Sequence, residues 1–261
     1  MSPSPVRRSS DLTTRAAAAV VMVATALVAL WLGGIALWIL VSVAALLMMA
    51  EWAELHGATA GQKRLAQYAI CVPLAITGPI AAGPGFLALG LIAGAAFFVV
   101  IVTQRPALAR GVLYCTLPGL AVLLLRGEGL LLALWALSLV WACDTGAYFA
   151  GRAIGGPKLA PTISPSKTWT GLIGGVLAAS LLAGALQYQG LPFHLVLATP
   201  LLAVLAQLGD LYESTIKRRA GVKDSGRLLP GHGGVLDRLD GLVPVAPAAA
   251  LMIELAKITP Q

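Results

Sequence analysis

Long apolar runs recur along most of the chain and constrain its fold more than any other feature. A helix that crosses about 30 Å of hydrocarbon needs roughly 20 apolar residues, and about 17 suffice. The chain has 261 residues, of which 58% are hydrophobic and 11% are charged, whereas soluble domains carry about 25% charged residues. The sequence therefore predicts an all-α fold, a bundle of transmembrane helices that forms one integral-membrane domain over residues 1–261.

The first apolar run, residues 16–50, is too long for a single crossing. Its 35 residues would form a helix of about 52 Å. Gly33 and Gly34 interrupt it, so we expect two helices joined by a tight turn. Seven more runs bring the expected number of spans to about nine: 68–82, 85–102, 107–125, 129–143, 171–187, 195–208 and 242–255.

Positive charge is distributed unevenly between the two sides of this arrangement. With a cytoplasmic N-terminus, 16 of the 18 Lys and Arg residues fall on the cytoplasmic side, and only Arg126 and Lys257 fall outside. Cytoplasmic loops of membrane proteins carry such an excess of basic residues. We therefore expect a multi-pass protein of the cell membrane, of the bacterial inner-membrane type. The spans exclude a soluble nucleic-acid-binding protein.

Two polar segments, residues 144–170 and 209–240, are expected to be cytoplasmic loops. They divide the domain into N-terminal spans, residues 16–143, and a C-terminal part, residues 144–261, that carries the chemistry. Four aspartates stand at the edges of spans in this second part: Asp144, Asp210, Asp237 and Asp240. Such carboxylates are costly beside hydrocarbon unless they are paired, hydrated or bound to a cation, and oxygen ligands suit Mg²⁺.

Asp237 and Asp240 are three residues apart, so a helical turn would place them on one face. Purely structural pairing of the aspartates with Arg218, Arg219 or Arg238 remains an alternative.

Basic and glycine-rich stretches surround these aspartates. Residues 230–234, PGHGG, offer backbone N–H groups for an anion, although no GxxxxGK[ST] motif is present. His232 is either a general base or a phosphate contact. Ser214 and Lys217 are three apart and could meet one ligand. In the other polar segment Lys158, Ser164 and Lys167 suit phosphate, with loop structure or lipid-headgroup contact as the alternative.

Residues 214–240, STIKRRAGVKDSGRLLPGHGGVLDRLD, resemble the signature of the phosphatidate cytidylyltransferases, also called CDP-diacylglycerol synthases. The upstream stretch DTGAYFAGRAIGGPKLAPTISPSKTWTG resembles the second cytoplasmic block of that family. The sequence departs from the family at Ser166, where lysine is common, and at Thr170, where glutamate is common. The departures remove a cation and a carboxylate from this segment.

The resemblance implies that phosphatidic acid attacks the α-phosphate of CTP, so that CDP-diacylglycerol forms and pyrophosphate leaves. It implies Mg²⁺ as a cofactor, with a second cation left open, held by Asp144, Asp210, Asp237 and Asp240. Asp237, Asp240, Lys217 and Ser214 are the expected catalytic residues. The expected substrate-binding residues are Lys158, Ser164, Lys167, Arg218, Lys223, Asp224, His232, Gly233, Gly234 and Arg238.

Three other functions remain to be separated from this one. A CTP-dependent lipid kinase would also bind CTP and a membrane lipid. A CDP-alcohol phosphotransferase would need the motif DGxxAR…GxxxD…D, which the sequence lacks. A transporter or channel would place polar residues at midspan, whereas here they gather at one face. Membrane lipid is an expected partner, and a homodimer is compatible with the glycine- and alanine-rich helices.

Overall fold

The computed structural model describes residues 7–226, 228 and 233–258, with side chains from residue 17 onward. Nine long helices, one short helix and a small hairpin make up this described part of the chain. In chain order they are α1 (Arg7–Leu32), α2 (Gly34–Leu55), α3 (Ala60–Ile76), α4 (Phe86–Thr103), α5 (Pro106–Glu128), α6 (Leu130–Ile154), β1 (Lys158–Ala160), β2 (Ser164–Thr168), α7 (Trp169–Gln187), α8 (Phe193–Arg219), α9 (Leu236–Leu239) and α10 (Leu242–Ile258).

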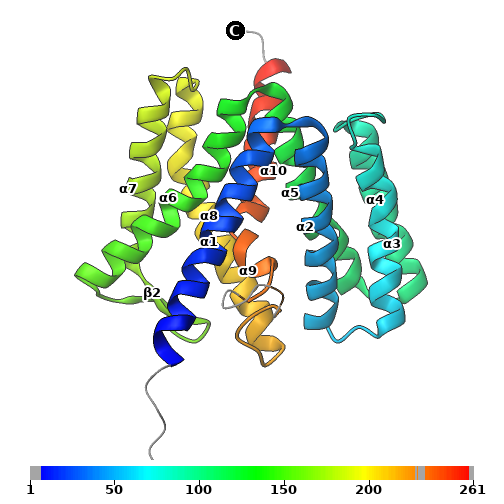
Figure 1. Cartoon of the computed structure of the whole chain (residues 1–261), viewed down its shortest axis with the longest axis horizontal. Helices are drawn as coiled ribbons and strands as arrows, with labels where there is room; N and C mark the ends of the chain where they lie inside the picture. The colour runs from blue at the N-terminus through cyan, green and yellow to red at the C-terminus, as the bar shows by residue number, and fades with distance from the viewer. Residues whose placement is uncertain (1–6, 227, 229–232, 259–261) are drawn as a thin grey trace, which may run out of the picture.

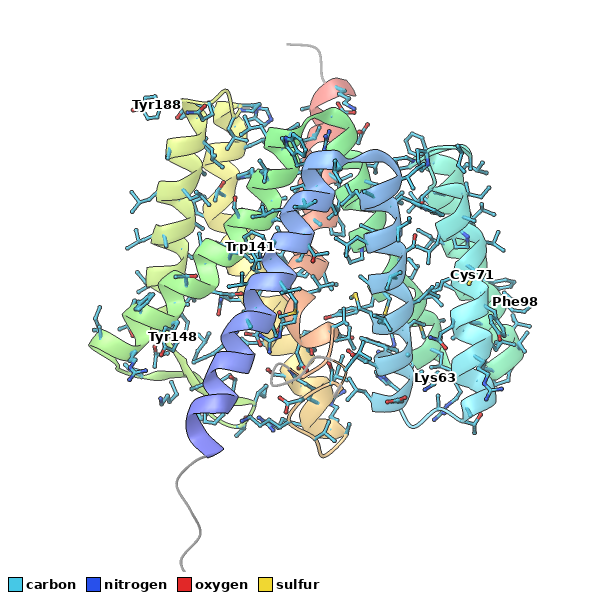
Figure 2. All side chains as sticks on the ribbon, viewed as in Figure 1. Lys63, Cys71, Phe98, Trp141, Tyr148 and Tyr188 are labelled. Carbon is cyan, nitrogen blue, oxygen red and sulfur yellow. The ribbon has the colours of Figure 1, made fainter. Side chains whose placement is uncertain are left out.

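The long helices present apolar side chains to the outside of the molecule. Within the described residues, α2, α4, α5, α6, α7 and α8 are long and apolar enough to cross a membrane, and α1 contributes a shorter apolar stretch, Ala17–Leu32. Phe98 and Tyr188 point outward (Figure 2), and Leu181 is 76% exposed. Exposed apolar surface on this scale would be costly in water. The chain is a helical membrane protein.

The helices run up and down, so that connections alternate between two ends of the bundle (Figure 1). The start of α1, the α2–α3 connection, β2 and the end of α8 all lie at one end, and the end of α10 lies at the other. The two polar segments therefore meet at one end of the molecule, as the sequence predicted. That this end faces the cytoplasm stays a prediction.

The predicted division of the first apolar run at Gly33 is confirmed. Gly33 takes a positive φ of 63° between α1 and α2, a conformation that glycine adopts without strain. Arg126 on α5 donates from Nε to the carbonyl of Leu30 at 2.6 Å and from a terminal nitrogen to that of Trp31 at 3.1 Å. A cation at a helix C-terminus satisfies the free carbonyls, which gives this exception to the charge bias a structural role.

Three helices extend past the predicted ends of their spans. The helix that was expected to end at Asp144 continues to Ile154, and α2 continues past Ala50 to Leu55. Beyond the span 195–208, α8 continues to Arg219, through the stretch 213–219 that was expected to be helical. An apolar run marks where hydrocarbon ends, whereas a helix continues while its backbone hydrogen bonds and packing continue. The expected loops are correspondingly shorter, and Asp144 and Asp210 lie inside helices.

The all-α expectation is wrong in one detail, because β1 and β2 form an antiparallel hairpin. Lys158 pairs with Thr168 and Ala160 with Ser164. Thr168 also begins α7, since its hydroxyl accepts a hydrogen bond from the N–H of Gly171 at 3.0 Å, as N-cap residues do. The hairpin is thereby attached rigidly to α7 and holds Lys167 at a defined place.

Close packing of α6 against α7 brings this hairpin next to α6. A side chain at Gly171 would place its Cβ 3.0 Å from the carbonyl of Ala147, and one at Gly146 would place it 2.7 Å from that of Gly174. Small residues at such contacts let membrane helices approach closely. The two helices therefore hold the hairpin and Asp144 in fixed relation.

Candidate active site

A cavity of about 390 Å³ with several charged and polar side chains in its lining opens between α6, β2, α7 and α8. We call it the acidic cavity, and its lining includes Asp144, Arg152, Ser166, Lys167, Gln207 and Asp210. Two of the four predicted aspartates thus line one cavity, together with the predicted Lys167. Its volume is sufficient for the polar head of a substrate.

One hydrogen-bonded chain crosses the acidic cavity. Nζ of Lys167 lies 2.5 Å from Oδ2 of Asp210 and donates to Oε1 of Gln207 at 3.0 Å. Nε2 of Gln207 donates to Oδ1 of Asp144 at 3.2 Å. Ser214 Oγ donates to Oδ1 of Asp210 at 3.3 Å. This series of hydrogen bonds links α6, which carries Asp144, to α8, which carries Asp210.

Asp240 lies next to α8, just before α10. A side chain at Gly209 would bring its Cβ within 2.5 Å of the Asp240 carbonyl, so this approach requires glycine. Oδ1 of Asp240 accepts the N–H of Gly241 at 2.8 Å. Burial, followed by repulsion from Asp210, raises the pKa of Asp240 from its usual 3.8 to about 7. Asp240 therefore lies close enough to Asp210 and Asp144 to be repelled by their negative charges.

Asp237 has different surroundings, although it belongs to the same motif. Its side chain is 5% exposed, and its Oδ1 accepts a hydrogen bond from Lys217 Nζ at 2.6 Å. Oδ2 accepts bonds from the N–H groups of Ser225 and Gly234, both at 2.8 Å, and from Ser225 Oγ at 2.9 Å.

Burial alone would raise the pKa of Asp237, but the bonds from Lys217, Gly234 and Ser225 outweigh it and hold that pKa below its usual value. Asp237 is thus a fixed anion that organises its neighbours.

Lys217 stands between two carboxylates. Besides Asp237 it lies 3.2 Å from Oε1 of Glu213, one turn earlier on α8, whose side chain is 1% exposed. Neither carboxylate oxygen of Glu213 accepts a hydrogen bond within the described residues. Ser214 and Lys217, which were expected to meet one ligand, point to different partners, Asp210 and Asp237.

The predicted metal ligands do not converge on one point. Within the described ranges, no three His, Cys, Asp or Glu side chains stand close enough together to hold a metal ion. The chemistry of Asp144, Asp210 and Asp240 nevertheless fits Mg²⁺, because two of them offer carboxylate oxygens to the acidic cavity and the third lies near Asp210. Asp237 remains a predicted ligand whose oxygens already have four donors.

The glycines of the PGHGG stretch have a different role from the predicted one wherever the structure describes them. Gly233 has a φ of 80°, and a Cβ there would lie 2.6 Å from Oδ2 of Asp237. A Cβ at Gly234 would collide with Ser225 and Glu51. The N–H of Gly234 donates to Asp237, so it is not free for a phosphate. These glycines make room for the protein's own side chains, and His232 lies outside the described residues.

The other predicted binding residues are distributed over the same end of the molecule. Arg218 donates from Nε to the carbonyl of Ile163, in the hairpin turn, at 3.3 Å, and so ties α8 to the hairpin. The rest are placed as follows: Lys158 exposed on β1, Ser164 half-buried on β2, Lys223 and Asp224 exposed after α8, and Arg238 exposed on α9 and electrostatically coupled to Asp144.

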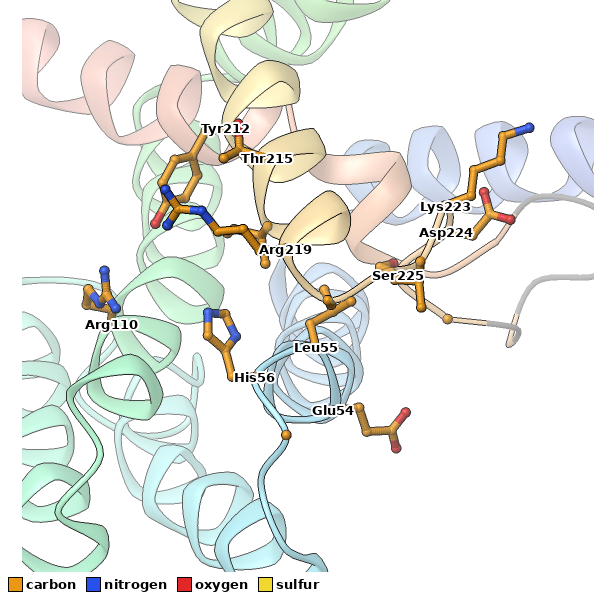
Figure 3. A pocket seen from close by; sticks show the side chains of 15 residues that line it. Glu54, Leu55, His56, Arg110, Tyr212, Thr215, Arg219, Lys223, Asp224 and Ser225 are labelled. Atoms are coloured by element: carbon orange, nitrogen blue, oxygen red, sulfur yellow. The ribbon is translucent and has the colours of Figure 1, made fainter. Parts of the chain in front are cut away.

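A second cavity, of about 1090 Å³, lies against the opposite side of α8. Arg110, Arg219 and His56 face one space there, beside Tyr212 (Figure 3). Lys223 and Asp224 also line this cavity, and Asp144, Lys167 and Asp210 line the acidic one. The two expected groups of phosphate-binding residues are therefore separated by α8.

Sequence reasoning missed three side chains of this region: Glu51, Gln207 and Glu213. Glu51 is 6% exposed and Gln207 is 5% exposed. Gln207 was visible as a polar residue within the predicted span 195–208, and Glu213 lies between Asp210 and Ser214. Glu51 directly follows the first apolar run. A polar side chain in or beside an apolar run is the signal that points to each of them.

Comparison with known proteins agrees with this picture. A profile described as "Cytidylyltransferase family" matches residues 13–256. The phosphatidate cytidylyltransferase of Brucella suis biovar 1 is 41% identical over 249 residues, which cover 91% of each chain. Proteins of the same name from Haemophilus influenzae and Staphylococcus epidermidis are each 47% identical, over 129 residues (46% of this chain, 44% of theirs) and 133 residues (49% and 51%).

Proposed function

This chain belongs to the cytidylyltransferase family, and on that premise we propose that it transfers the cytidylyl group of CTP to phosphatidic acid. The products are CDP-diacylglycerol, a precursor for phospholipid synthesis, and pyrophosphate. The observation that carries the proposal beyond the relatives' name is the acidic cavity. It places Lys167 between Asp144 and Asp210 at the end of the bundle where the polar segments meet.

The reaction needs little proton transfer. An anionic oxygen of the phosphatidate phosphate attacks the α-phosphorus of CTP, the new P–O bond forms, and the bond to the bridging oxygen of pyrophosphate breaks. Catalysis of such transfers rests mainly on positioning and on stabilising negative charge. Lys167 in the acidic cavity and Lys217, whose charge acts on Asp240, are the cations that would bind phosphate oxygens. A general base at His232 is not required.

We propose Mg²⁺ as the cofactor, held by Asp144, Asp210 and Asp240. When bound, it would offset the charge of the triphosphate. Lys167 would then leave Asp210 and bind a phosphate oxygen. The exchange is possible because its flexible ammonium group can pair with either anion, the carboxylate or the phosphate. Asp237 would keep Lys217 pointed toward the reacting groups. This division of labour follows from the contacts described for each aspartate.

We further propose nine crossings, with α1, α3 and α10 added to the six longest apolar helices. The N-terminus and the polar end would face the cytoplasm, which supplies CTP, in the cell membrane, which supplies phosphatidic acid. The charge bias of the sequence supports this orientation. In it, the substrates meet where the acidic cavity opens.

Purified protein in detergent micelles, supplied with phosphatidic acid and radiolabelled CTP, tests the proposal. We expect label from [α-³²P]CTP in the lipid fraction, no label from [γ-³²P]CTP, loss of activity with EDTA and its return with Mg²⁺. Transfer of γ-label to lipid would indicate a kinase. Consumption of CDP-diacylglycerol with an alcohol would indicate a phosphotransferase, and no lipid product under any condition would contradict the enzyme assignment.

A further inference from the structure

A buried glutamate on α2 reaches the segment that carries the family signature. Glu51 is 6% exposed. Its Oε1 accepts the N–H of Val235 at 2.9 Å, and its Oε2 accepts the N–H of Leu236 at 2.9 Å. These bonds join residues 184 and 185 positions apart in the chain. A helix in the N-terminal half therefore fixes the backbone directly before Asp237.

The same carboxylate reaches the beginning of this segment. Oγ of Ser225 lies 3.0 Å from Oε2 of Glu51. A Cβ at Gly226 would lie 2.8 Å from Oε1 of Glu51, and one at Gly234 would collide with both Glu51 and Ser225. A side chain at either glycine would therefore collide with Glu51. The carboxylate holds the two ends of the segment, near Ser225 and near Leu236, together.

From Glu51 a continuous set of contacts leads to Lys217. The hydroxyl of Ser225 also lies 2.9 Å from Oδ2 of Asp237, whose Oδ1 accepts from Lys217 at 2.6 Å. The single hydroxyl proton of Ser225 can be donated to either carboxyl group, so Ser225 links Glu51 to Asp237. The backbone bonds to Val235 and Leu236 add a second, rigid connection to Asp237.

We propose that Glu51 is a positioning residue for the transfer reaction. It contacts no reacting group itself. It holds Ser225 and the backbone of Val235 and Leu236 so that Asp237 keeps Lys217 directed at the substrate phosphates. The set Glu51, Ser225, Asp237 and Lys217 is called the loop anchor below. This inference rests on the proposed function for its catalytic consequence, whereas the anchoring is a property of the folded chain.

The variant Glu51→Gln tests the inference with little change in shape. Its amide oxygen can still accept one bond, but its NH₂ group must face an N–H donor or the Ser225 hydroxyl, so at least one bond is lost. We expect kcat to fall about 10- to 100-fold, because a misplacement of about 1 Å can cost 100-fold, with a smaller change in KM for CTP.

Glu54→Gln is the matched control. It makes the same chemical change one turn later on α2, at an exposed residue that pairs with Lys63 at 2.6 Å, and we expect wild-type kcat.

Rates are compared per folded molecule, well below each variant's unfolding temperature, so that lost stability alone leaves kcat unchanged. A wild-type kcat in folded Glu51→Gln would overturn the inference. If this variant does not fold, Ser225→Ala replaces it. That change keeps both backbone bonds to Glu51, so we expect a fall of about 3- to 10-fold, and an unchanged kcat would overturn the inference equally.

Hydrogen exchange gives a readout that does not depend on activity. In Glu51→Gln we expect faster exchange of the amides of Val235 and Leu236, with exchange in α5 unchanged, whereas Glu54→Gln leaves both unchanged. Unaltered exchange at Val235 and Leu236 would overturn the anchoring. If the wild type incorporates no CTP label, the proposed function fails, while this measurement still decides whether Glu51 anchors the segment.

Discussion

The acidic cavity and the loop anchor each contain an aspartate from the second polar segment, but the two side chains differ in exposure and in their partners. In the acidic cavity, the side chain of Asp210 is 29% exposed and pairs with Lys167, a neighbour that a substrate phosphate can exchange. In the loop anchor, the side chain of Asp237 is 5% exposed and accepts four hydrogen bonds. The difference indicates that one carboxylate is available to ligands and the other is committed to structure.

The largest expected effect separates the two regions by activity. Asp210→Asn removes a carboxylate from the acidic cavity, and we expect turnover to fall about 100- to 1,000-fold, as when one group that stabilises transition-state charge is lost. Its unfolding free energy should change by about 1 kcal/mol or less, because the ion pair is partly exposed. Radiolabelled CTP incorporation and thermal unfolding measure the two quantities, and turnover within about threefold of wild type would contradict the assignment.

The next largest effect distinguishes the acidic cavity from the loop anchor by the stability of their variants. Asp237→Asn weakens the bond to Lys217 and one of the contacts to Ser225 or Gly234 within the protein interior, so we expect a loss of about 2–3 kcal/mol in the free energy of unfolding. Activity should fall as well, because Lys217 loses its direction. Thermal unfolding beside Asp210→Asn gives the comparison. Equal stabilities of the two variants would show that the loop anchor is not structural.

The two regions should also respond to pH in opposite directions. The pKa of Asp240 is raised to about 7, so without Mg²⁺ its contribution to stability is present at low pH and is lost as pH rises from about 4 through 7. The pKa of Asp237 is lowered, so its contribution is present above about pH 4 and is lost as pH falls through its folded value.

Unfolding temperatures measured from pH 4 to 8 in EDTA test this. We expect Asp240→Asn to make the decrease toward pH 8 smaller and to leave the acid side unchanged. A decrease as steep as that of the wild type would contradict the assignment to Asp240.

The smallest effect concerns one of the two departures from the family pattern. Ser166 is exposed and lines the acidic cavity. Ser166→Lys restores the common cation, and we expect KM for CTP to fall about two- to fivefold, since an exposed charge pair contributes about 0.5–1 kcal/mol. Hydrogen exchange in the loop anchor should not change. An unchanged KM would show that residue 166 does not face the nucleotide.

Several features were predictable from the sequence because they depend on composition and local spacing. The apolar runs predicted the long helices, except that the helix expected over 68–82 runs from Ala60 to Ile76. The glycine pair at 33–34 predicted the division of the first run. Charge bias and the position of the polar segments predicted that they meet at one end. The motif predicted the family. The division of the chain into N-terminal spans and a catalytic part, at residue 143, stays a prediction.

The roles of individual site residues were less predictable. Spacing of three suggested that Asp237 and Asp240 share a ligand, yet Asp237 turns to Lys217 and Asp240 lies near Asp210. The glycines of PGHGG suggested room for phosphate, whereas Gly233 and Gly234 accommodate Asp237, Ser225 and Glu51. Local sequence cannot distinguish space for a ligand from space for a side chain that arrives from another helix.

By itself the sequence determined a helical membrane protein of the cytidylyltransferase family with its polar chemistry at one end, because hydrophobic spacing, charge asymmetry and a long motif are local properties. Only the tertiary structure decided which aspartates face a cavity and which are enclosed. Glu51 illustrates the reason: its partners lie 174 to 185 residues away. Contacts across such separations arise only when α2 packs beside the segment around α9, which places a carboxylate against backbone N–H groups that would otherwise be buried without a partner.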